Sequence, residues 1–351
     1  MITDLRLQNF RSYKDGSFKF NSGVNIIVGP NASGKTNLLE AILVLARGNS
    51  YRVRDNELIN FGQPWARLDE INESGSKRII KINTEPLLTK TYEIDNQVFK
   101  RLSLAHSLPV VLFEPNHLQL FAGGPERRRD YLDDLLEQTT TGYSTTRRHY
   151  KRALAQRNSL LKQGHGSNAN QFFPWNLRLS QLAGQIVRAR TDLVERLNKD
   201  ITELYKELSQ ADTSVSLSYG HRWSADNYET NFLKKLETDL DRDQLRGFTG
   251  SGPHREDLLV MYDDRLATET ASRGEVRTAV LALKILELKI LADARQQTPL
   301  LLLDDVFSEL DARRRQSLTD YLADYQTFIT TTDADLITKN FSKNTNIIEL
   351  T

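Results

Sequence analysis

Apolar and polar positions follow two periods along the chain, and together they predict an α/β protein. Short strand-like runs at residues 24–28, 300–303 and 326–331 are typical of strands buried in a parallel sheet. The alternation of Leu5, Arg6 and Leu7 predicts a further strand with one buried face. A long amphipathic helix is predicted downstream, with apolar residues at Val276, Val280, Leu283, Leu286 and Ile290.

The segment between the run at 24–28 and the helical pattern at 37–43 has the composition of a phosphate-binding loop. It consists of Gly29, Pro30, Asn31, Ala32, Ser33, Gly34, Lys35 and Thr36. The glycines let backbone N–H groups face phosphates, Lys35 adds a positive charge near the β- and γ-oxygens, and Thr36 offers a hydroxyl to Mg²⁺. We therefore expect ATP and Mg²⁺ as cofactors. A glycine-rich turn without a ligand is the alternative, which the flanking strand and helix disfavour.

Two carboxylates follow the run at 300–303, as expected where a parallel strand delivers an acid to Mg²⁺. Asp304 is assigned to the metal side, together with Thr36. Asp305, which points to the other side of the strand end, is assigned to orient or deprotonate the attacking water. Two aspartates that only cap a strand end are the alternative. The expected catalytic residues are Lys35, Asp304 and Asp305.

Composition bounds the function without deciding it. The 351 residues carry a formal net charge of +1, so any surface for a polyanion must be local. Cysteine is absent, which excludes disulfides, thiolate zinc sites and cysteine nucleophiles. The chain starts with a strand-like alternation, and no apolar run approaches the roughly 20 residues of a membrane span. We expect a soluble, cytoplasmic protein without a membrane partner.

A second anion site is indicated where the predicted downstream helix begins. Its residues are Ser272, Arg273, Gly274 and Glu275. A serine and a glycine at a helix N-terminus can bind an anion, although any helix can be capped in this way. The segment precedes Asp304, and Ser308, Glu309 and Asp311 follow it, which is the order found in ATP-binding-cassette heads. In those heads the serine–glycine helix of one subunit completes the ATP site of another, so ATP would hold two copies together.

Several stretches resemble the RecF family of bacterial recombination-repair ATPases, which are relatives of SMC heads. They are residues 7–13, 29–42, 50–52, 57–59, 124–133 and 249–258, and the resemblance covers nearly the whole chain. The last two stretches are not shared by cassette ATPases generally. The resemblance implies that Arg11 joins the ATP-binding residues and that the protein forms a homodimer with ATP. It also implies binding to single- and double-stranded DNA at gapped or tailed junctions, with RecR, RecO and RecA as partners.

Three positions depart from the pattern of these families. Glu275 stands where RecF sequences usually carry glutamine, which leaves Ser272 and Gly274 as the safer ligands in the contact between subunits. Asp305 replaces the glutamate of most cassette ATPases, and its shorter side chain predicts slow hydrolysis. No histidine follows Thr332, where transporter ATPases keep a γ-phosphate sensor.

A basic segment indicates the substrate. Between Gln138 and Thr191 there is no Asp or Glu, and two helical stretches are joined there by a glycine-rich tip at residues 164–167. Lysine and arginine at phosphates bind DNA in a salt-sensitive way without reading its sequence. A solvated helical face is the alternative, but such faces usually mix both charge signs. The DNA-binding residues expected here are Arg147, Arg148, Lys151, Arg152, Arg157 and Lys162.

Two further charged motifs stay open at this stage. The arginines at 127–129 precede Asp130, Asp133 and Asp134, so they form either an internal set of ion pairs or the root of the basic surface. His254 and Arg255 follow a Gly252–Pro253 turn, and we assign them to a contact near the subunit or arm interface.

These placements predict one discontinuous cassette-type phosphate-loop head with an inserted, mainly helical arm. The head comprises residues 1–124 and 211–351, and the arm comprises residues 125–210, with residues 225–245 of open assignment. The arm is far too short for the long coiled coil of SMC relatives.

The expected function is ATP-dependent DNA binding in recombinational repair and replication restart, with weak, DNA-stimulated ATPase activity. An ATP-bound dimer would clamp DNA at single-strand/double-strand boundaries and assist RecA loading. The energising subunit of a transporter and a small-molecule kinase are the alternatives. The transporter subunit would require a glutamate at position 305 and a sensor histidine, and the kinase would not require Ser272 to Gly274.

Overall fold

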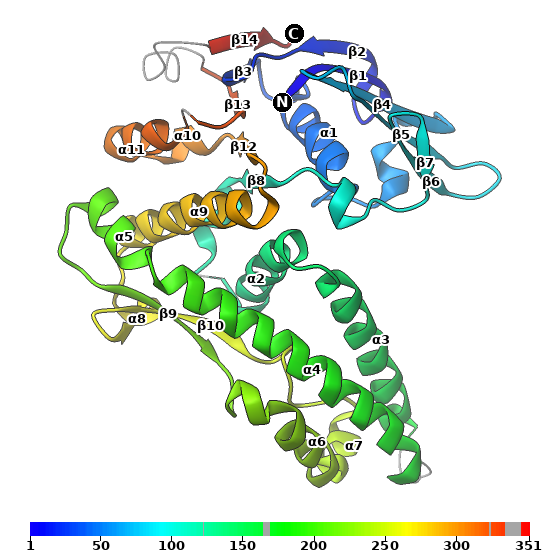
Figure 1. The fold of residues 1–351 in the computed structure, drawn as a ribbon, viewed down its shortest axis with the longest axis vertical. Helices are drawn as coiled ribbons and strands as arrows, with labels where there is room; N and C mark the ends of the chain where they lie inside the picture. The colour runs from blue at the N-terminus through cyan, green and yellow to red at the C-terminus, as the bar shows by residue number, and fades with distance from the viewer. Residues whose placement is uncertain (122, 164–168, 323, 334–344) are drawn as a thin grey trace. The chain divides into compact units, whose positions relative to one another are not determined.

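The computed structural model describes residues 1–121, 123–163, 169–322, 324–333 and 345–351. Its internal contacts separate the chain into two units (Figure 1). The first unit consists of Met1–His117 and Glu287–Thr351, and the second consists of Leu118–Leu286. Each unit is described by itself.

The first unit contains a six-stranded antiparallel sheet in the order β2-β1-β4-β5-β6-β7. Leu5 and Leu7 of its first strand are buried, whereas Arg6 between them is exposed, which confirms the strand predicted from their alternation. The strands are β1 (Ile2–Phe10), β2 (Tyr13–Lys19), β4 (Trp65–Asn72), β5 (Lys77–Asn83), β6 (Thr89–Ile94) and β7 (Gln97–Phe99).

A five-stranded parallel sheet in the order β14-β3-β13-β12-β8 forms the other layer of this unit. Its strands are β3 (Val24–Val28), β8 (Val110–Phe113), β12 (Leu300–Asp304), β13 (Thr327–Thr331) and β14 (Thr345–Glu349). Nearly every residue of β3, β12 and β13 is buried, as the unbroken apolar runs predict for central parallel strands. The sequence prediction of these strands is confirmed, and β8 is an addition to it.

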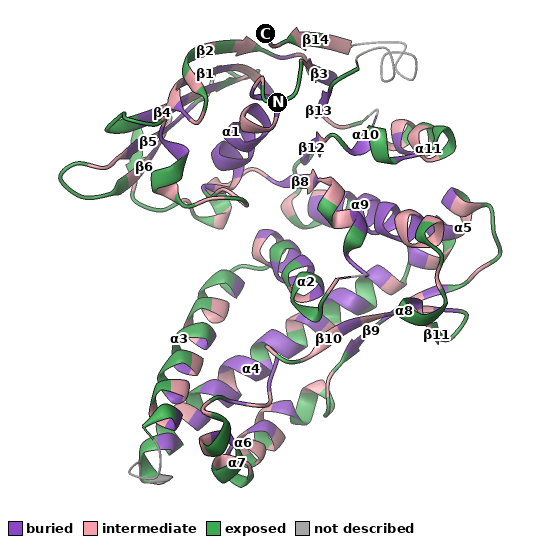
Figure 2. Cartoon of the chain, turned by 180° about the vertical axis from the view of Figure 1, so that it is seen from behind, coloured by how far each residue is buried: buried purple, intermediate pink, exposed green. Residues whose placement is uncertain are grey.

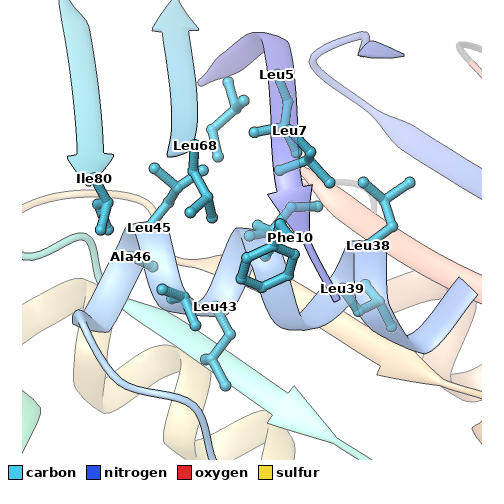
Figure 3. Close-up of a cluster of buried hydrophobic side chains, with 14 of the residues drawn as sticks. Leu5, Leu7, Phe10, Leu38, Leu39, Leu43, Leu45, Ala46, Leu68 and Ile80 are labelled. Carbon is cyan, nitrogen blue, oxygen red and sulfur yellow. The ribbon is translucent and has the colours of Figure 1, made fainter. Parts of the chain in front are cut away.

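The helix α1 (Lys35–Arg47) packs between the two sheets and is buried from Leu38 to Ala46, mostly through apolar side chains. Figure 3 shows its buried leucines against Leu5, Leu7 and Phe10 of β1, with Leu68 and Ile80 from the neighbouring strands. The same core continues to Leu302 and Phe328 of the parallel sheet. Because α1 begins directly after the predicted phosphate loop, this core fixes the position of that loop.

Smaller elements complete the first unit. They are η1 (Asp55–Leu58), η2 (Leu104–His106), α10 (Val306–Glu309) and α11 (Ala312–Leu322). Two elements run across the boundary between the units along the chain: η3 (Pro115–Gln119) and α9 (Arg273–Arg295).

Helices dominate the second unit, together with a three-stranded sheet in the order β11-β10-β9. The strands are β9 (Val215–Gly220), β10 (Asp257–Tyr262) and β11 (Arg265–Leu266). The helices are α2 (Pro125–Thr139), α3 (Tyr143–Lys162), α4 (Ala169–Asn198), α5 (Ile201–Ser209), η5 (Ala225–Asn227), α6 (Tyr228–Thr238), α7 (Leu240–Arg246) and α8 (Ala267–Thr270). The long helix α4 packs against α3 and α6.

The two units differ from the boundaries expected from the sequence. Residues 211–286 were expected in the head, but they belong to the same unit as the helical arm. The reason is that β9 and β10, which pair with each other from Val215 to Tyr262, pack against the arm helices α4 and α2. The expected helical pair is present as α3 and α4, and the glycine-rich tip at 164–167 lies outside the described residues.

A buried arginine links four segments of the second unit. The guanidinium of Arg157 on α3 is fully buried and forms an ion pair with Asp243, at 2.7 Å between NH1 and Oδ2. Its other donors reach Asn176 Oδ1 at 2.7 Å, Thr249 Oγ1 at 2.8 Å and the Leu236 carbonyl at 3.0 Å. Burial lowers the pKa of Arg157, and the Asp243 carboxylate opposes that effect. The residue is structural, so its assignment to DNA binding is wrong.

We expect Arg157→Met to lower the free energy of unfolding of the second unit by about 3–5 kcal/mol, because Asp243 would remain buried without its partner. The measurement is the urea midpoint followed by circular dichroism, with Arg152→Met as a control at an exposed position of the same helix. The double variant Arg157→Met with Asp243→Leu should recover part of the loss. Equal midpoints for the two single variants would show that the buried pair contributes nothing.

Candidate functional site

The phosphate loop connects β3 to α1 in the first unit and requires glycine at two positions. Gly34 precedes α1 with φ +99°, a left-handed conformation that glycine adopts without strain. At Gly29 a Cβ atom would lie 2.6 Å from the Leu350 carbonyl oxygen and 2.6 Å from Ser33 Oγ. The loop therefore fits against β14 only with glycine at position 29.

Lys35 lies inside this loop. Its ammonium donates hydrogen bonds to the carbonyls of Gly29 and Pro30, both at 2.7 Å, and the side chain is buried. The positive charge is thus held against the backbone turn, beside the first N–H groups of α1. Such a combination of a lysine and a helix N-terminus suits a phosphate group.

Thr36 joins the loop to the second nucleotide motif. Its hydroxyl donates to Asp304 Oδ1 at 3.0 Å, and the Thr330 hydroxyl donates to the same oxygen at 2.7 Å. Asp304 ends β12, which lies beside β13 in parallel register. The predicted pair of Thr36 and Asp304 is therefore brought together from distant parts of the chain.

The donors at this point fit Mg²⁺. A hydroxyl and a carboxylate are hard oxygen ligands, and Mg²⁺ usually takes one or two protein ligands beside water and substrate phosphates. Within the described ranges, no group of three or more histidine, cysteine or acidic side chains could hold a metal ion by itself. The residues therefore suit a cation that binds together with a phosphate ligand.

Asp305 adopts a left-handed conformation, with φ 52° and ψ 24°, between β12 and α10. Its amide donates to Thr330 Oγ1 at 3.0 Å, and the Ser308 hydroxyl donates to its carbonyl at 2.7 Å. Partial burial raises the pKa of Asp305, the Ser308 hydroxyl opposes that effect, and the neighbouring charge of Asp304 adds to it. A carboxylate with a raised pKa is a better proton acceptor for a water molecule.

Glu114 is a residue that the sequence reasoning missed. It follows β8, whose Phe113 pairs with Leu303 of β12, so Glu114 and Asp304 leave the same edge of the parallel sheet. Burial raises the pKa of Tyr51, and the charges of Asp304 and Glu114 raise it further. The run at 110–113 followed by an acid repeats the pattern at 300–304 and could have revealed this position.

Arg11 lies beside the loop and is held by other groups of the first unit. Its Nε is 2.9 Å from Glu40 Oε2, and NH1 donates to the Glu57 carbonyl at 3.0 Å. Arg11, Ser12 and Asn37 also line a pocket of about 610 Å³ that continues to the exposed ring of Phe61. This pocket is large enough for part of a small ligand, and Asn37 places it next to the first turn of α1.

The segment at the start of α9 forms a capping box in the second unit. The amide of Ser272 donates to Glu275 Oε2 at 2.7 Å, and the amide of Glu275 donates to Ser272 Oγ at 3.3 Å. Glu275 thus has a structural role, and its departure from the family glutamine changes the residue that closes this box. Ser272 and Arg273 are exposed at the helix start.

The acidic segment after Asp305 also forms local caps. Ser308 binds the Asp305 backbone as described, and Asp311 Oδ1 accepts the amide of Arg314 at 2.9 Å at the start of α11. Ser308, Glu309 and Asp311 are exposed in the first unit.

The predicted basic residues divide into two groups. Arg148, Lys151, Arg152 and Lys162 are exposed along α3, whose outer face is visible in Figure 2. Arg147 instead forms ion pairs with Asp130, Asp133 and Glu137 at 2.8–3.0 Å. Arg147 and the buried Arg157 are thus paired with internal acids. Of the six residues expected to bind phosphate, the other four are exposed.

The arginines at 127–129 are mainly internal. Arg128 is buried and forms a two-point ion pair with Asp257, at 2.8 and 2.7 Å. Arg129 donates to the Glu256 carbonyl at 2.8 Å, whereas Arg127 is exposed. These contacts anchor α2 to the start of β10, so Arg128 and Arg129 have internal partners, but these are Asp257 and Glu256 and not the acids at 130–134.

His254 supports the turn that precedes β10. Its Nε2 lies 3.1 Å from the Thr249 carbonyl, and its Nδ1 lies 2.7 Å from the Tyr150 hydroxyl. Because a carbonyl only accepts, Nε2 carries the proton and Nδ1 accepts from Tyr150. Burial lowers the pKa of His254 to about 4, partly opposed by the bond to Thr249.

The described part of the chain has no helix long and apolar enough to span a membrane.

The parallel sheet, the phosphate loop and the paired Thr36 and Asp304 define a phosphate-loop ATPase head of the ATP-binding-cassette type. The RecF/RecN/SMC N-terminal domain model matches residues 1–350. The chain belongs to the RecF family. This membership sets aside the transporter subunit and the small-molecule kinase.

Relatives and solved structures agree with this family. A DNA replication and repair protein RecF of Streptococcus gordonii is 34% identical over 358 residues, covering 99% of this chain and 98% of the relative. That of Acetivibrio thermocellus is 32% identical over 355 residues, covering 98% and 96%. A structure of the recombination mediator protein RecF-ATPrS in the RecFOR pathway has a TM-score of 0.87 at 29% identity and covers 96% of this chain and 94% of that one. An Smc head bound to a ScpA domain shares the fold, with a TM-score of 0.58 at 17% identity and coverage of 99% and 93%.

The pKa of His254 makes stability depend on pH. The His254 side chain takes up a proton near pH 6.5 in the unfolded chain but only near pH 4 in the folded one. The folded state is therefore most stable, as far as His254 decides it, above pH 6.5, and its free energy of unfolding decreases as the pH falls towards 4. We expect His254→Asn to reduce this pH dependence by about 3 kcal/mol, measured as urea midpoints at several pH values. His149→Asn serves as a control. If wild type and His254→Asn lost stability equally as the pH falls, His254 would not be the source of the pH dependence.

Proposed function

We propose that this chain is an ATP-dependent DNA-binding protein of recombinational repair and replication restart. Two copies close around ATP, clamp DNA at single-strand/double-strand boundaries, and release it after slow hydrolysis. The observation that carries the proposal is the bond from Thr36 to Asp304, which joins the phosphate loop to its acidic partner. The similarity to a recombination mediator RecF with ATPrS supports the same nucleotide chemistry.

Each residue of the nucleotide site has a distinct task. Lys35 and the amides at the start of α1 bind the β- and γ-phosphates, while the pocket beside Arg11 and Asn37 accommodates the nucleoside. Thr36 and Asp304 would hold Mg²⁺, which would supply positive charge to the phosphates when bound. Asp305 accepts a proton from the attacking water, and its short side chain makes this step slow. The activity is a weak, DNA-stimulated ATPase.

The dimer is completed by the exposed start of α9. Ser272, Arg273 and Gly274 of one copy face the γ-phosphate bound by the other, with Ser308, Glu309 and Asp311 beside the contact. The capping box supports this role, because it holds the Ser272 hydroxyl in a defined place at the positive end of a long helix.

Exposed cations of α3 bind the DNA backbone. Arg148, Lys151 and Arg152 lie within little more than one helical turn and are all exposed, so they can contact neighbouring phosphates. A solved structure named for the RecFOR pathway supports RecO and RecR as partners. The resemblance to the family adds RecA as the recombinase that is loaded. We place the protein in the cytoplasm at the nucleoid.

We expect Asp305→Asn to bind ATP and to form a persistent ATP-dependent dimer, because the amide keeps the shape but cannot accept a proton. Hydrolysis should fall by about 10²- to 10⁴-fold, the usual range for a lost general base. Phosphate release and light scattering after size exclusion measure the two effects. Asp320→Asn, on α11, is the matched control. A folded Asp305→Asn protein that no longer dimerises with ATP would refute the role of this carboxylate.

The triple variant Arg148→Glu, Lys151→Glu and Arg152→Glu should bind duplex DNA weakly while ATP binding stays intact. The slope of log K against log salt should decrease by up to about 2.7, since each lost phosphate contact removes roughly 0.9. Fluorescence anisotropy with a gapped duplex at several salt concentrations provides both values.

The matched control reverses three exposed lysines of the first unit, Lys14, Lys19 and Lys100. It changes the net charge by the same amount but leaves α3 intact, so its affinity should stay close to that of wild type. Unchanged affinity of the α3 variant, or equal losses in both variants, would exclude α3 as the DNA surface.

A further inference from the structure

A partly exposed aromatic ring with an arginine over it lies in the second unit, near two further cations. Phe248 follows α7 and is 40% exposed, and the guanidinium carbon of Arg255 lies 4.9 Å from the centre of its ring. Arg246 and Lys162 are exposed nearby. We refer to Lys162, Arg246, Phe248 and Arg255 as the Phe248 cluster.

The glycines beside Phe248 show how closely these cations gather. A Cβ atom at Gly247 would lie 3.7 Å from Cγ of Lys162, the last residue of α3. At Gly250 the corresponding atom would lie 3.3 Å from NH1 of Arg246. Lys162 and Arg246 thus lie beside the residues that flank Phe248, and Arg255 lies over its ring, so three positive side chains from separate segments gather along residues 247–255.

Buried polar contacts of the neighbouring residue Thr249 hold the Phe248 cluster in place. Thr249, next to Phe248, binds Asn158 Oδ1 through its amide at 2.8 Å and through its hydroxyl at 2.7 Å. Arg157 donates to the same hydroxyl, and His254 lies against the Thr249 carbonyl. Gly252 has φ +123°, and a Cβ there would lie 2.8 Å from both Phe232 and Tyr150. The Gly252–Pro253–His254–Arg255 turn therefore positions Arg255 over Phe248 on a rigid base.

An exposed aromatic ring with planar cations is suited to an unpaired base. A base can stack on the exposed part of the Phe248 ring, while lysine and arginine neutralise the adjoining phosphates. An apolar protein segment would also cover a phenylalanine, but it would desolvate Arg246 and Arg255 without offering them an anion. The positive charge of the cluster thus favours a nucleic acid strand as its occupant.

We propose that the Phe248 cluster binds single-stranded DNA by base stacking. This inference rests on the proposed DNA-binding function and deepens it. Lys162 continues the exposed face of α3, since Lys151 and Lys162 are 11 residues apart along one helix, about three turns. Duplex phosphates then lie on Arg148, Lys151 and Arg152, and the unpaired strand continues to Phe248. The second unit then carries both a surface for the duplex, on α3, and a surface for the unpaired strand, at the Phe248 cluster.

The test uses the full chain with ATP and Mg²⁺ and a labelled oligothymidine of about 12 nucleotides, within the site sizes known for single strands. Phe248→Ala should weaken its binding by about 5- to 100-fold, the range for one lost stacking contact. Phe248→Leu should lose affinity as Phe248→Ala does, and Phe248→Trp should retain it. Affinity for a blunt duplex should not change in any of them. Circular dichroism melting verifies that each variant is folded.

Phe173→Ala is the matched control, because it removes an exposed ring from α4 in the same unit. A photo-crosslink from 5-iodouracil in the oligomer, located by mass spectrometry, should map to the peptide that contains Phe248. Wild-type affinity of Phe248→Leu for oligothymidine would overturn the inference. So would a wild-type protein that binds the duplex but not the oligomer. Failure to bind either DNA would instead refute the proposed function itself.

Discussion

The Thr330 hydroxyl is the contact on which the geometry of the nucleotide site depends. It donates a hydrogen bond to Asp304 Oδ1 and accepts one from the backbone amide of Asp305. One side chain of β13 thus orients Asp304, which ends β12, and Asp305, which follows it. This is possible because β3, β13, β12 and β8 are parallel and in register, and their carboxyl ends meet at one edge. A shift of one residue would turn each of these side chains to the other face of the sheet.

The local parts of this site could be predicted from the sequence. The phosphate loop, β3 and α1 depend on neighbouring residues, and an unbroken apolar run identifies β12 without knowledge of its partners. Glu114 was missed because β8 is only four residues long, and its importance comes from a neighbour that is distant in the chain. The boundary between the units differs from the expected one for a similar reason, since β9 and β10 join the arm through non-local packing against α4 and α2. Propensity carries no information about such pairings.

Charge in the basic segment was a less reliable guide than periodicity. The absence of acids indicated a cationic arm, but it could not separate surface arginines from internal ones. Tyr150, Ala153, Arg157 and Leu161 are all buried on one face of α3. Arg157 thus stands at the helical spacing of apolar residues, which was a readable signal that its side chain points inward. The acids that pair with Arg147 and Arg157 lie outside the segment, at positions such as Asp133 and Asp243, so the local count missed them.

The buried arginines also join distant segments of the second unit through ion pairs and hydrogen bonds. Removing Arg157 and Arg190 from water has a large desolvation cost, which Asp243 and Asp133 offset through direct ion pairs. Each guanidinium then uses its remaining donors on uncharged groups of other segments: Thr249 for Arg157, and the Tyr219 hydroxyl and Pro253 carbonyl for Arg190. Both networks converge on the turn at 249–255. They therefore hold the segment that carries Arg255 and Phe248 in place, because this segment accepts hydrogen bonds from two buried guanidinium groups at Thr249 and Pro253.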